Sequence, residues 1–82
     1  MAKEILLSEL PVGRCGRVVC LRTNGIIRRR LLELGLVPET KIKTIRHSPL
    51  GDPVLFQFRG TLIALRREEA RQILVSPESL KK

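Results

Sequence analysis

One stretch of this 82-residue chain, PVLFQFRGTLIALR at 53–66, restricts the fold more than any other. If Arg59 and Gly60 form a two-residue hairpin loop, residues equally far from the loop oppose one another and share a face of the antiparallel pair. Arg59 is unusual there, because tight hairpin loops favour Gly, Asn or Asp at that position. One face of the hairpin is then a core face, with Val54, Phe56, Phe58, Ile63 and Leu65. The opposite face is also fairly apolar and carries Leu55, Gln57, Leu62 and Ala64.

Other β-rich stretches flank the hairpin in the sequence. RVVCLR at 17–22 and KIKTIR at 41–46 both have the composition of a strand. The apolar residues of the second stretch, Ile42 and Ile45, are three positions apart, which predicts a bulge or a bend. After the hairpin, REEARQILV predicts a short helical turn at about 67–72 and then a last strand.

The best-marked helix lies in TNGIIRRRLLELGLVP, over about 25–35. Thr23 or Asn24 can cap its start. Gly35 suits the left-handed position after its end, and Leu36 can fold back on the last turn. Apolar residues recur at helical spacing on one face, at Ile27, Leu31 and Leu34.

Five short strands with one or two small helices predict a mainly β protein, a small, bent, mostly antiparallel barrel. The length predicts a single domain over 1–75, and the polar end SPESLKK predicts a flexible tail at 76–82. No apolar run reaches the ~18 residues that a membrane span requires. We therefore expect a cytoplasmic protein without membrane insertion.

The chain is strongly basic, with a net charge of +8 from 16 Lys and Arg against 8 Asp and Glu. Such a charge favours nucleic acid, an anionic membrane surface or an acidic protein as the partner. Only two aromatic residues, Phe56 and Phe58, are present. Their scarcity is evidence against a protein that stacks single-stranded bases on aromatic rings.

No catalytic or metal-binding constellation is apparent. The one histidine, His47, is typical of a surface residue beside a turn. Cys15 and Cys20, five positions apart, point to opposite faces of a regular strand unless Gly16 marks a bulge, so we expect small apolar side chains rather than metal ligands. The chain contains no GxxxxGK[ST] nucleotide loop. We expect no enzymatic activity, no cofactor and no resident metal.

The loop SPLGDP at 48–53 is the first candidate for a binding site. Its prolines and glycine suit a tight connection, and Asp52 can fix the turn by bonding its own backbone. Leu50 at its centre either packs back onto the barrel or is exposed as a partner anchor. The second alternative predicts one apolar docking patch together with residues of the hairpin's second face, namely Leu50, Leu55, Leu62 and Ala64. Part of that face could instead lie under the helix.

Three consecutive arginines, Arg28, Arg29 and Arg30, form the sharpest charge cluster. They lie nearer the positive end of the helix dipole than that dipole favours. One interpretation is a solvated helix face. The other is a contact with an acidic partner surface at the rim of the docking patch, and an arginine that reaches a partner's nucleotide is a remoter possibility.

The order of the motifs resembles that of the FeoA family, small cytoplasmic companions of bacterial ferrous iron transport. The resemblance rests on LSELPVGRCGRVVCL, RRRLLELGLVPETKI and SPLGDPVLFQFRGTLIALRREEARQIL, and it spans roughly residues 6–75. It implies an SH3-like antiparallel barrel with the helix at about 25–35 inserted after the first long strand. The same fold occurs as the C-terminal domain of DtxR-type metal-dependent repressors.

The resemblance also implies a partner, the ferrous iron permease FeoB, which has a cytoplasmic guanine-nucleotide-binding domain. We therefore expect an accessory protein that modulates transport or the nucleotide cycle through protein–protein contacts. A basic nucleic-acid-binding module and an Fe²⁺ metallochaperone are alternatives, and an exposed apolar sheet face could also pair two copies of the chain. One residue departs from the family pattern: Glu39 follows Pro38 where Gly is frequent, which favours a type I over a type II turn.

Overall fold

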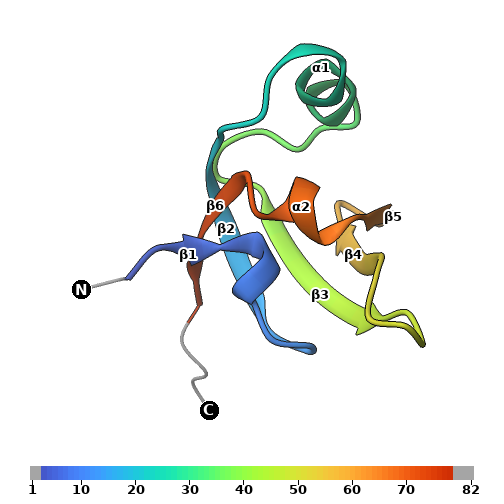
Figure 1. The fold of residues 1–82 in the computed structure, drawn as a ribbon. Helices are drawn as coiled ribbons and strands as arrows, with labels where there is room; N and C mark the ends of the chain where they lie inside the picture. Colours follow the sequence, from blue (N-terminus) through green and yellow to red (C-terminus); the bar gives the residue numbers. More distant parts are fainter. Residues whose placement is uncertain (1–2, 79–82) are drawn as a thin grey trace.

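A computed structural model describes residues 3–78 as a curved antiparallel sheet with two short α-helices (Figure 1). In chain order the elements are β1 (Ile5–Leu6), the 3-10 helix η1 (Leu7–Glu9), β2 (Cys15–Leu21), α1 (Gly25–Glu33), β3 (Lys41–His47), β4 (Val54–Phe58), β5 (Thr61–Leu65), α2 (Arg67–Ala70) and β6 (Ile73–Pro77). The strand order is β1-β6-β2-β3-β4-β5. The edge strands β1 and β5 are not paired with each other in the described residues. The sheet is therefore not closed, and it is close to the expected SH3-like barrel.

The β4–β5 hairpin has the register predicted from the sequence, from Phe58 opposite Thr61 to Val54 opposite Leu65. The two loop residues, Arg59 and Gly60, have φ angles of 53° and 76°. Two successive positive φ angles characterise the type I′ loop, whose twist matches that of the flanking strands. Arg59 therefore adopts a conformation that L-residues other than Gly, Asn and Asp rarely adopt.

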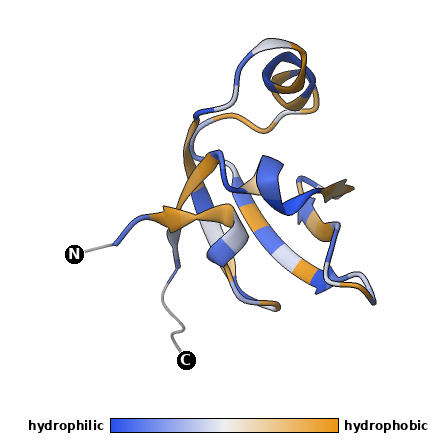
Figure 2. Ribbon diagram, viewed as in Figure 1, coloured by the Kyte–Doolittle hydropathy of each residue, from blue (hydrophilic) through white to orange (hydrophobic). Residues whose placement is uncertain are grey.

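The core lies on the inner face of the curved sheet. Figure 2 shows the alternation of hydrophilic and hydrophobic residues along β3, whose inward residues Ile42 and Thr44 are buried. Helices η1 and α2 lie over this inner face and contribute the buried Leu7 and Ala70 (Figure 1). The predicted core face of the hairpin belongs to this cluster, with Val54, Phe56, Phe58 and Leu65 buried and Ile63 packed against it.

Helix α1 lies at one end of the sheet and is joined to the core through its C-terminal end (Figure 1). Gly35 has a φ of 102°; its N–H donates to the Leu32 carbonyl, and the Leu36 N–H donates to the Leu31 carbonyl. These two bonds form a Schellman motif. Leu31 and Leu36 are both buried, as expected, because the motif folds the chain back on the last turn.

Two expectations about α1 need correction. Leu34, predicted on the apolar face, is 41% exposed, because the helix ends at Glu33 and Leu34 is already the C-cap residue. Asn24 occupies the N-cap position, but its side chain makes no capping hydrogen bond. The helix is therefore held by its C-terminal motif and by core packing rather than by a side-chain cap.

The turn between α1 and β3 differs from the expected type I geometry. Glu39 has a φ of 77°, and the Thr40 N–H donates to the Val37 carbonyl at 3.1 Å, which is the pattern of a type II turn. The Glu39 N–H donates to the Val18 carbonyl of β2 at 2.8 Å, and the Val37 N–H donates to the Thr40 hydroxyl oxygen at 3.2 Å. These bonds impose the left-handed conformation although the residue is not glycine.

The bulge predicted in the third strand is present, as a register shift between Thr44 and Arg46. A second shift in β2 lies between Val18 and Cys20, not at Gly16. The strand β6 extends to Pro77, two residues into the predicted tail, and the rest of that tail from 79 onward lies outside the described residues. Helix α2 is shorter than predicted and ends at Ala70. Within residues 3–78 no helix is long and apolar enough to cross a membrane.

We expect Glu39→Gly to raise the free energy of unfolding by about 0.5–1 kcal/mol. The left-handed conformation costs roughly 1–2 kcal/mol for a residue with a Cβ, and the greater entropy of glycine in the unfolded chain cancels part of that gain. Urea unfolding at equilibrium measures the difference. Glu39→Ala is the matched control, because it removes the carboxylate and keeps the Cβ. An equal gain in both variants would show that charge, not backbone conformation, is responsible.

Candidate functional site

The loop at residues 48–53, called the Leu50 loop below, is held in a defined shape by its own backbone. The Gly51 N–H donates to the Ser48 carbonyl at 2.8 Å, and the Ser48 N–H donates to the Pro53 carbonyl at 3.1 Å. Gly51 has a φ of 89°, and the Asp52–Pro53 peptide bond is cis. At its tip the Leu50 side chain is 94% exposed. Of the two alternatives open in the sequence, the exposed leucine is therefore the one found.

Arg67, the first residue of α2, ties this loop to the body of the protein. Its backbone N–H donates to Asp52 Oδ1 at 2.9 Å, and its Nε–H donates to the Gly51 carbonyl at 2.9 Å. Its Nη2 donates to His47 Nδ1 at 3.1 Å. Asp52 was expected to bond its own backbone; it instead accepts from Arg67, because the first N–H groups of a helix lack partners within the helix.

The second face of the hairpin lies beside the Leu50 loop and is open to solvent. Leu62 is 56% exposed, Ala64 is exposed and Leu55 is half-buried. Register places Leu55 opposite Ala64, and Leu62 opposite Gln57 on β4. We call this the outer face of the sheet. The alternative that it lies under the helix is not found for Leu62. The two leucines and Ala64 thus accompany Leu50 on the surface.

A small apolar hollow of about 180 Å³ separates the loop from the hairpin. Among its lining residues, Ser48 has a buried Oγ without a hydrogen-bond partner in the described part of the chain. A hydroxyl left unpaired costs free energy that a binding partner with a polar group can recover. The hollow is lined by Arg46, Ser48, Pro49, Pro53, Leu55 and Ala64.

The three arginines of α1 do not all lie at the rim of the apolar docking patch. All are exposed, and none forms an ion pair with a described residue. Arg30 lines a narrow hollow together with Ile63, Ala64 and Leu65 and therefore lies beside the edge strand β5. Arg28 and Arg29 line a different, open hollow on α1 itself, beside Ile26, which is 84% exposed.

Other cations, which the sequence analysis did not single out, adjoin the apolar residues. On β3, Lys43 is paired in register with Gln57, and Arg46 with Leu55. Lys41 and Lys43 alternate with buried residues along the strand. This two-residue period in the sequence could have predicted that both lysines lie on the outer face of the sheet. For Arg46 that signal was broken by the bulge, because a bulge shifts the later side chains by one position.

The thiols and the histidine are dispersed. Cys15 lies opposite Lys43 of β3, whereas Cys20 lies opposite Leu74 of β6. Both thiols are free and half-buried. Over the range 3–78, no three residues among His, Cys, Asp and Glu come close enough together to hold a metal ion. His47 accepts its hydrogen bond from Arg67 and thereby contributes to the loop.

Comparison with known proteins identifies the family. The model of the FeoA domain matches residues 5–77. An Fe²⁺ transport protein A/Fe²⁺ transporter FeoB fusion protein of Porphyromonas gingivalis is 38% identical over 69 residues, which are 84% of this chain. The match spans only 8% of that much longer protein.

Solved structures agree with this assignment. The FeoA protein of Chlorobium tepidum is 38% identical with a TM-score of 0.88, over 95% of this chain and 74% of that one. FeoA of Stenotrophomonas maltophilia, solved in complex with zinc and described as a prokaryotic SH3-domain protein, is 36% identical with a TM-score of 0.80, over 90% and 95%. IdeR of T. acidophilum, 20% identical with a TM-score of 0.79 over 95% of this chain and 36% of that one, shares the fold alone.

We expect Arg67→Ala to loosen the Leu50 loop while the core stays folded. The substitution removes the two side-chain hydrogen bonds, to Gly51 and His47, and keeps the backbone bond to Asp52. Each bond contributes about 0.5–1.5 kcal/mol, so amide exchange at Gly51 should accelerate by about tenfold in hydrogen-exchange NMR. Arg71→Ala, which removes the exposed arginine at the end of the same helix, is the control. Equal exchange at Gly51 in both variants would show that the side chain of Arg67 does not hold the loop.

Proposed function

Because this chain belongs to the FeoA family, we propose that it is an accessory protein of ferrous iron uptake that binds the cytoplasmic part of an FeoB-type permease. The proposed contact is the docking patch formed by the exposed tip of the Leu50 loop and the outer face of the hairpin. The protein would act without catalysis, by binding one conformational state of the permease more tightly than another. The residues of the patch are Leu50, Leu55, Leu62 and Ala64, with Arg30 at its edge.

The observation that carries this proposal is the exposure of Leu50 on a loop that is otherwise tightly held. A large apolar side chain that is 94% exposed gains about 1.5–3 kcal/mol when a partner covers it fully. A loop that is already ordered by Arg67 loses little conformational freedom on binding, which leaves more of that gain as affinity. A loop that only connected two strands would require neither an exposed leucine nor the hydrogen bonds from Arg67.

The identity of the partner is supported by gene organisation in a relative. The P. gingivalis protein is named as a fusion of transport protein A and the transporter FeoB. Fusion places two domains at a high effective concentration, which is useful where they must meet. We infer that this chain meets an FeoB-type permease from the cytoplasmic side of the membrane.

Arg28 and Arg29 enter the proposal as a second, separate contact. They lie on α1 beside Ile26, outside the hollow that Arg30 shares with the hairpin. An acidic surface of the permease that reached α1 would cover them. Their contribution is therefore independent of the Leu50 loop and is tested by Ile26→Asp, described below.

We expect Leu50→Asp to weaken binding to the cytoplasmic part of the host's permease by at least about tenfold. Covering the Leu50 side chain contributes about 1.5–3 kcal/mol to binding, and burying a carboxylate in its place adds a further cost. Since a factor of ten in affinity corresponds to about 1.4 kcal/mol, the loss should be at least about tenfold. Isothermal titration calorimetry at physiological salt, first with GDP and then with a GTP analogue, measures the affinity in both nucleotide states.

Val12→Asp is the matched control, since it places the same charge on another exposed aliphatic residue that lines neither proposed contact. Loss of binding in Leu50→Asp and not in Val12→Asp supports the docking patch. A loss in Ile26→Asp as large as that in Leu50→Asp would move α1, with Arg28 and Arg29, into the main contact. If the wild-type chain bound DNA tightly in a salt-dependent manner and did not bind the permease, the proposal would be wrong and the basic charge would mark a nucleic-acid-binding protein.

A further inference from the structure

Another hollow, of about 470 Å³, opens where β2 and β3 meet the turn of the β4–β5 hairpin. Three of its lining residues, Lys41, Lys43 and Arg59, are cations, and none is a carboxylate. We call it the basic hollow. Its full lining is Cys15, Lys41, Lys43, Gln57, Phe58, Arg59 and Gly60.

Strand register and one tertiary contact bring these cations together. Lys41 and Lys43 point outward from β3 because they alternate with buried residues. Arg59 comes from the hairpin turn, and its side chain extends over the end of α1: a Cβ at Gly35 would lie 3.1 Å from its Nη1. Bringing like charges together raises their free energy, so a bound anion stabilises the arrangement.

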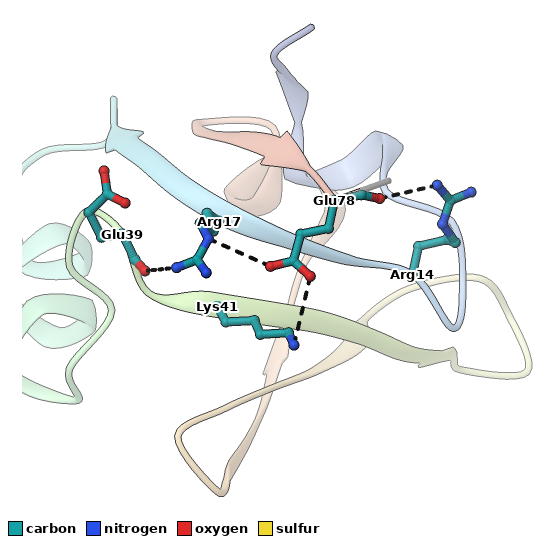
Figure 3. Close-up of polar contacts among 5 residues, drawn as sticks. All are labelled: Arg14, Arg17, Glu39, Lys41 and Glu78. Carbon is teal, nitrogen blue, oxygen red and sulfur yellow. Dashed lines mark hydrogen bonds and ion pairs between the residues drawn. The ribbon is translucent and has the colours of Figure 1, made fainter. Parts of the chain in front are cut away.

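The chain itself places a carboxylate at the edge of this surface. Figure 3 shows Glu78 between Arg17 Nε, at 3.6 Å from Oε2, and Lys41 Nζ, at 3.7 Å from Oε1. Arg17 lies opposite Lys41 in the sheet, so the carboxylate bridges one cross-strand pair of cations. The outer face of β2 and β3 therefore already holds one carboxylate, that of Glu78.

The next cations along the same surface have no such partner. Neither Lys43 nor Arg59 forms an ion pair with any residue in the described range 3–78, and both are exposed. Lys43 lies opposite Gln57, whose amide lines the same hollow and donates hydrogen bonds as readily as it accepts them. Two cations without an ion pair and an amide thus line one open volume.

The basic hollow is continuous with the docking patch. Register places Lys43, Gln57 and Leu62 in one row across β3, β4 and β5. Neighbouring strands lie about 4.8 Å apart, so Lys43 and Leu62 are about 10 Å apart, which one short peptide segment can span. The only ring in the lining, that of Phe58, is 1% exposed and cannot stack on a nucleic-acid base.

We propose that the basic hollow binds carboxylate side chains of an acidic segment of the permease, next to the apolar contact made by Leu62. The inference rests on the proposed function and specifies the chemistry of the partner's surface: Asp or Glu side chains beside an apolar residue. Lys43 and Arg59 pair with the carboxylates, and Gln57 donates a hydrogen bond. Because both cations are solvent-exposed before binding, the pairing mainly accelerates association and selects the partner.

Charge reversal at Lys43 tests this inference in the full chain. We expect Lys43→Glu to weaken binding to the permease's cytoplasmic part by about tenfold, mostly through a slower association rate, and Lys43→Gln to weaken it less. The loss should shrink as salt is raised, since screening removes the contribution of exposed charges. Surface plasmon resonance at two salt concentrations measures both rates, and thermal unfolding verifies that each variant is folded.

Lys3→Glu is the control, because it makes the same change in net charge at an exposed residue outside the basic hollow. A reduced association rate in Lys43→Glu and not in Lys3→Glu supports the acidic segment. Equal effects of the two variants would assign the loss to net charge and overturn the inference. Unchanged binding by Lys43→Glu, alongside weakened binding by Leu50→Asp, would overturn the inference and leave the proposed function standing. Absence of wild-type binding would overturn both.

Discussion

The rest of the structure depends on the register of the β4–β5 hairpin. A two-residue loop leaves no freedom to slip, because a shift of one position would exchange the two faces of each strand. Phe56 and Phe58 therefore point inward, where they are the largest fully buried side chains, and Leu55 and Leu62 point outward. The same constraint that builds the core thus places leucines on the surface. That coupling explains why Leu62 and Ala64 are exposed on the outer face of the sheet.

Hydrogen bonds from Arg67 determine where the Leu50 loop lies relative to this outer face. Arg67 reaches from α2 to the Leu50 loop with backbone and side-chain hydrogen bonds, so the loop is fixed relative to the barrel and not to the hairpin alone. The hollow between the Leu50 loop and the hairpin is consequently already formed before any partner binds. A preformed surface of this kind suits recognition of a partner. Within residues 3–78, no three residues among His, Cys, Asp and Glu lie close enough together to hold a metal ion.

The fold is shared with proteins of another function. The manganese-dependent transcriptional repressor, 13% identical with a TM-score of 0.82 over 95% of this chain, contains the same architecture as 44% of its own length. At that identity only the arrangement of the backbone is comparable, so a role must be argued from particular side chains. The contacts proposed for this chain involve the exposed Leu50 and the cations along β3, where Glu78 is paired with Arg17 and Lys41.

The sequence by itself determined the hairpin register, the left-handed turn at Gly35 that follows α1 and the mainly β class, because each follows from local periodicity and turn chemistry. Its order of motifs was also sufficient to indicate the family. Three features were decided by tertiary structure alone: the left-handed conformation of Glu39, the bond from Arg67 to the Leu50 loop, and the hollow that Arg59 and Lys43 both line. Each joins residues distant in the chain, or imposes a backbone conformation that the residue disfavours. Local preferences of about 1 kcal/mol are overridden there by hydrogen bonds and packing that exist only once the sheet has formed.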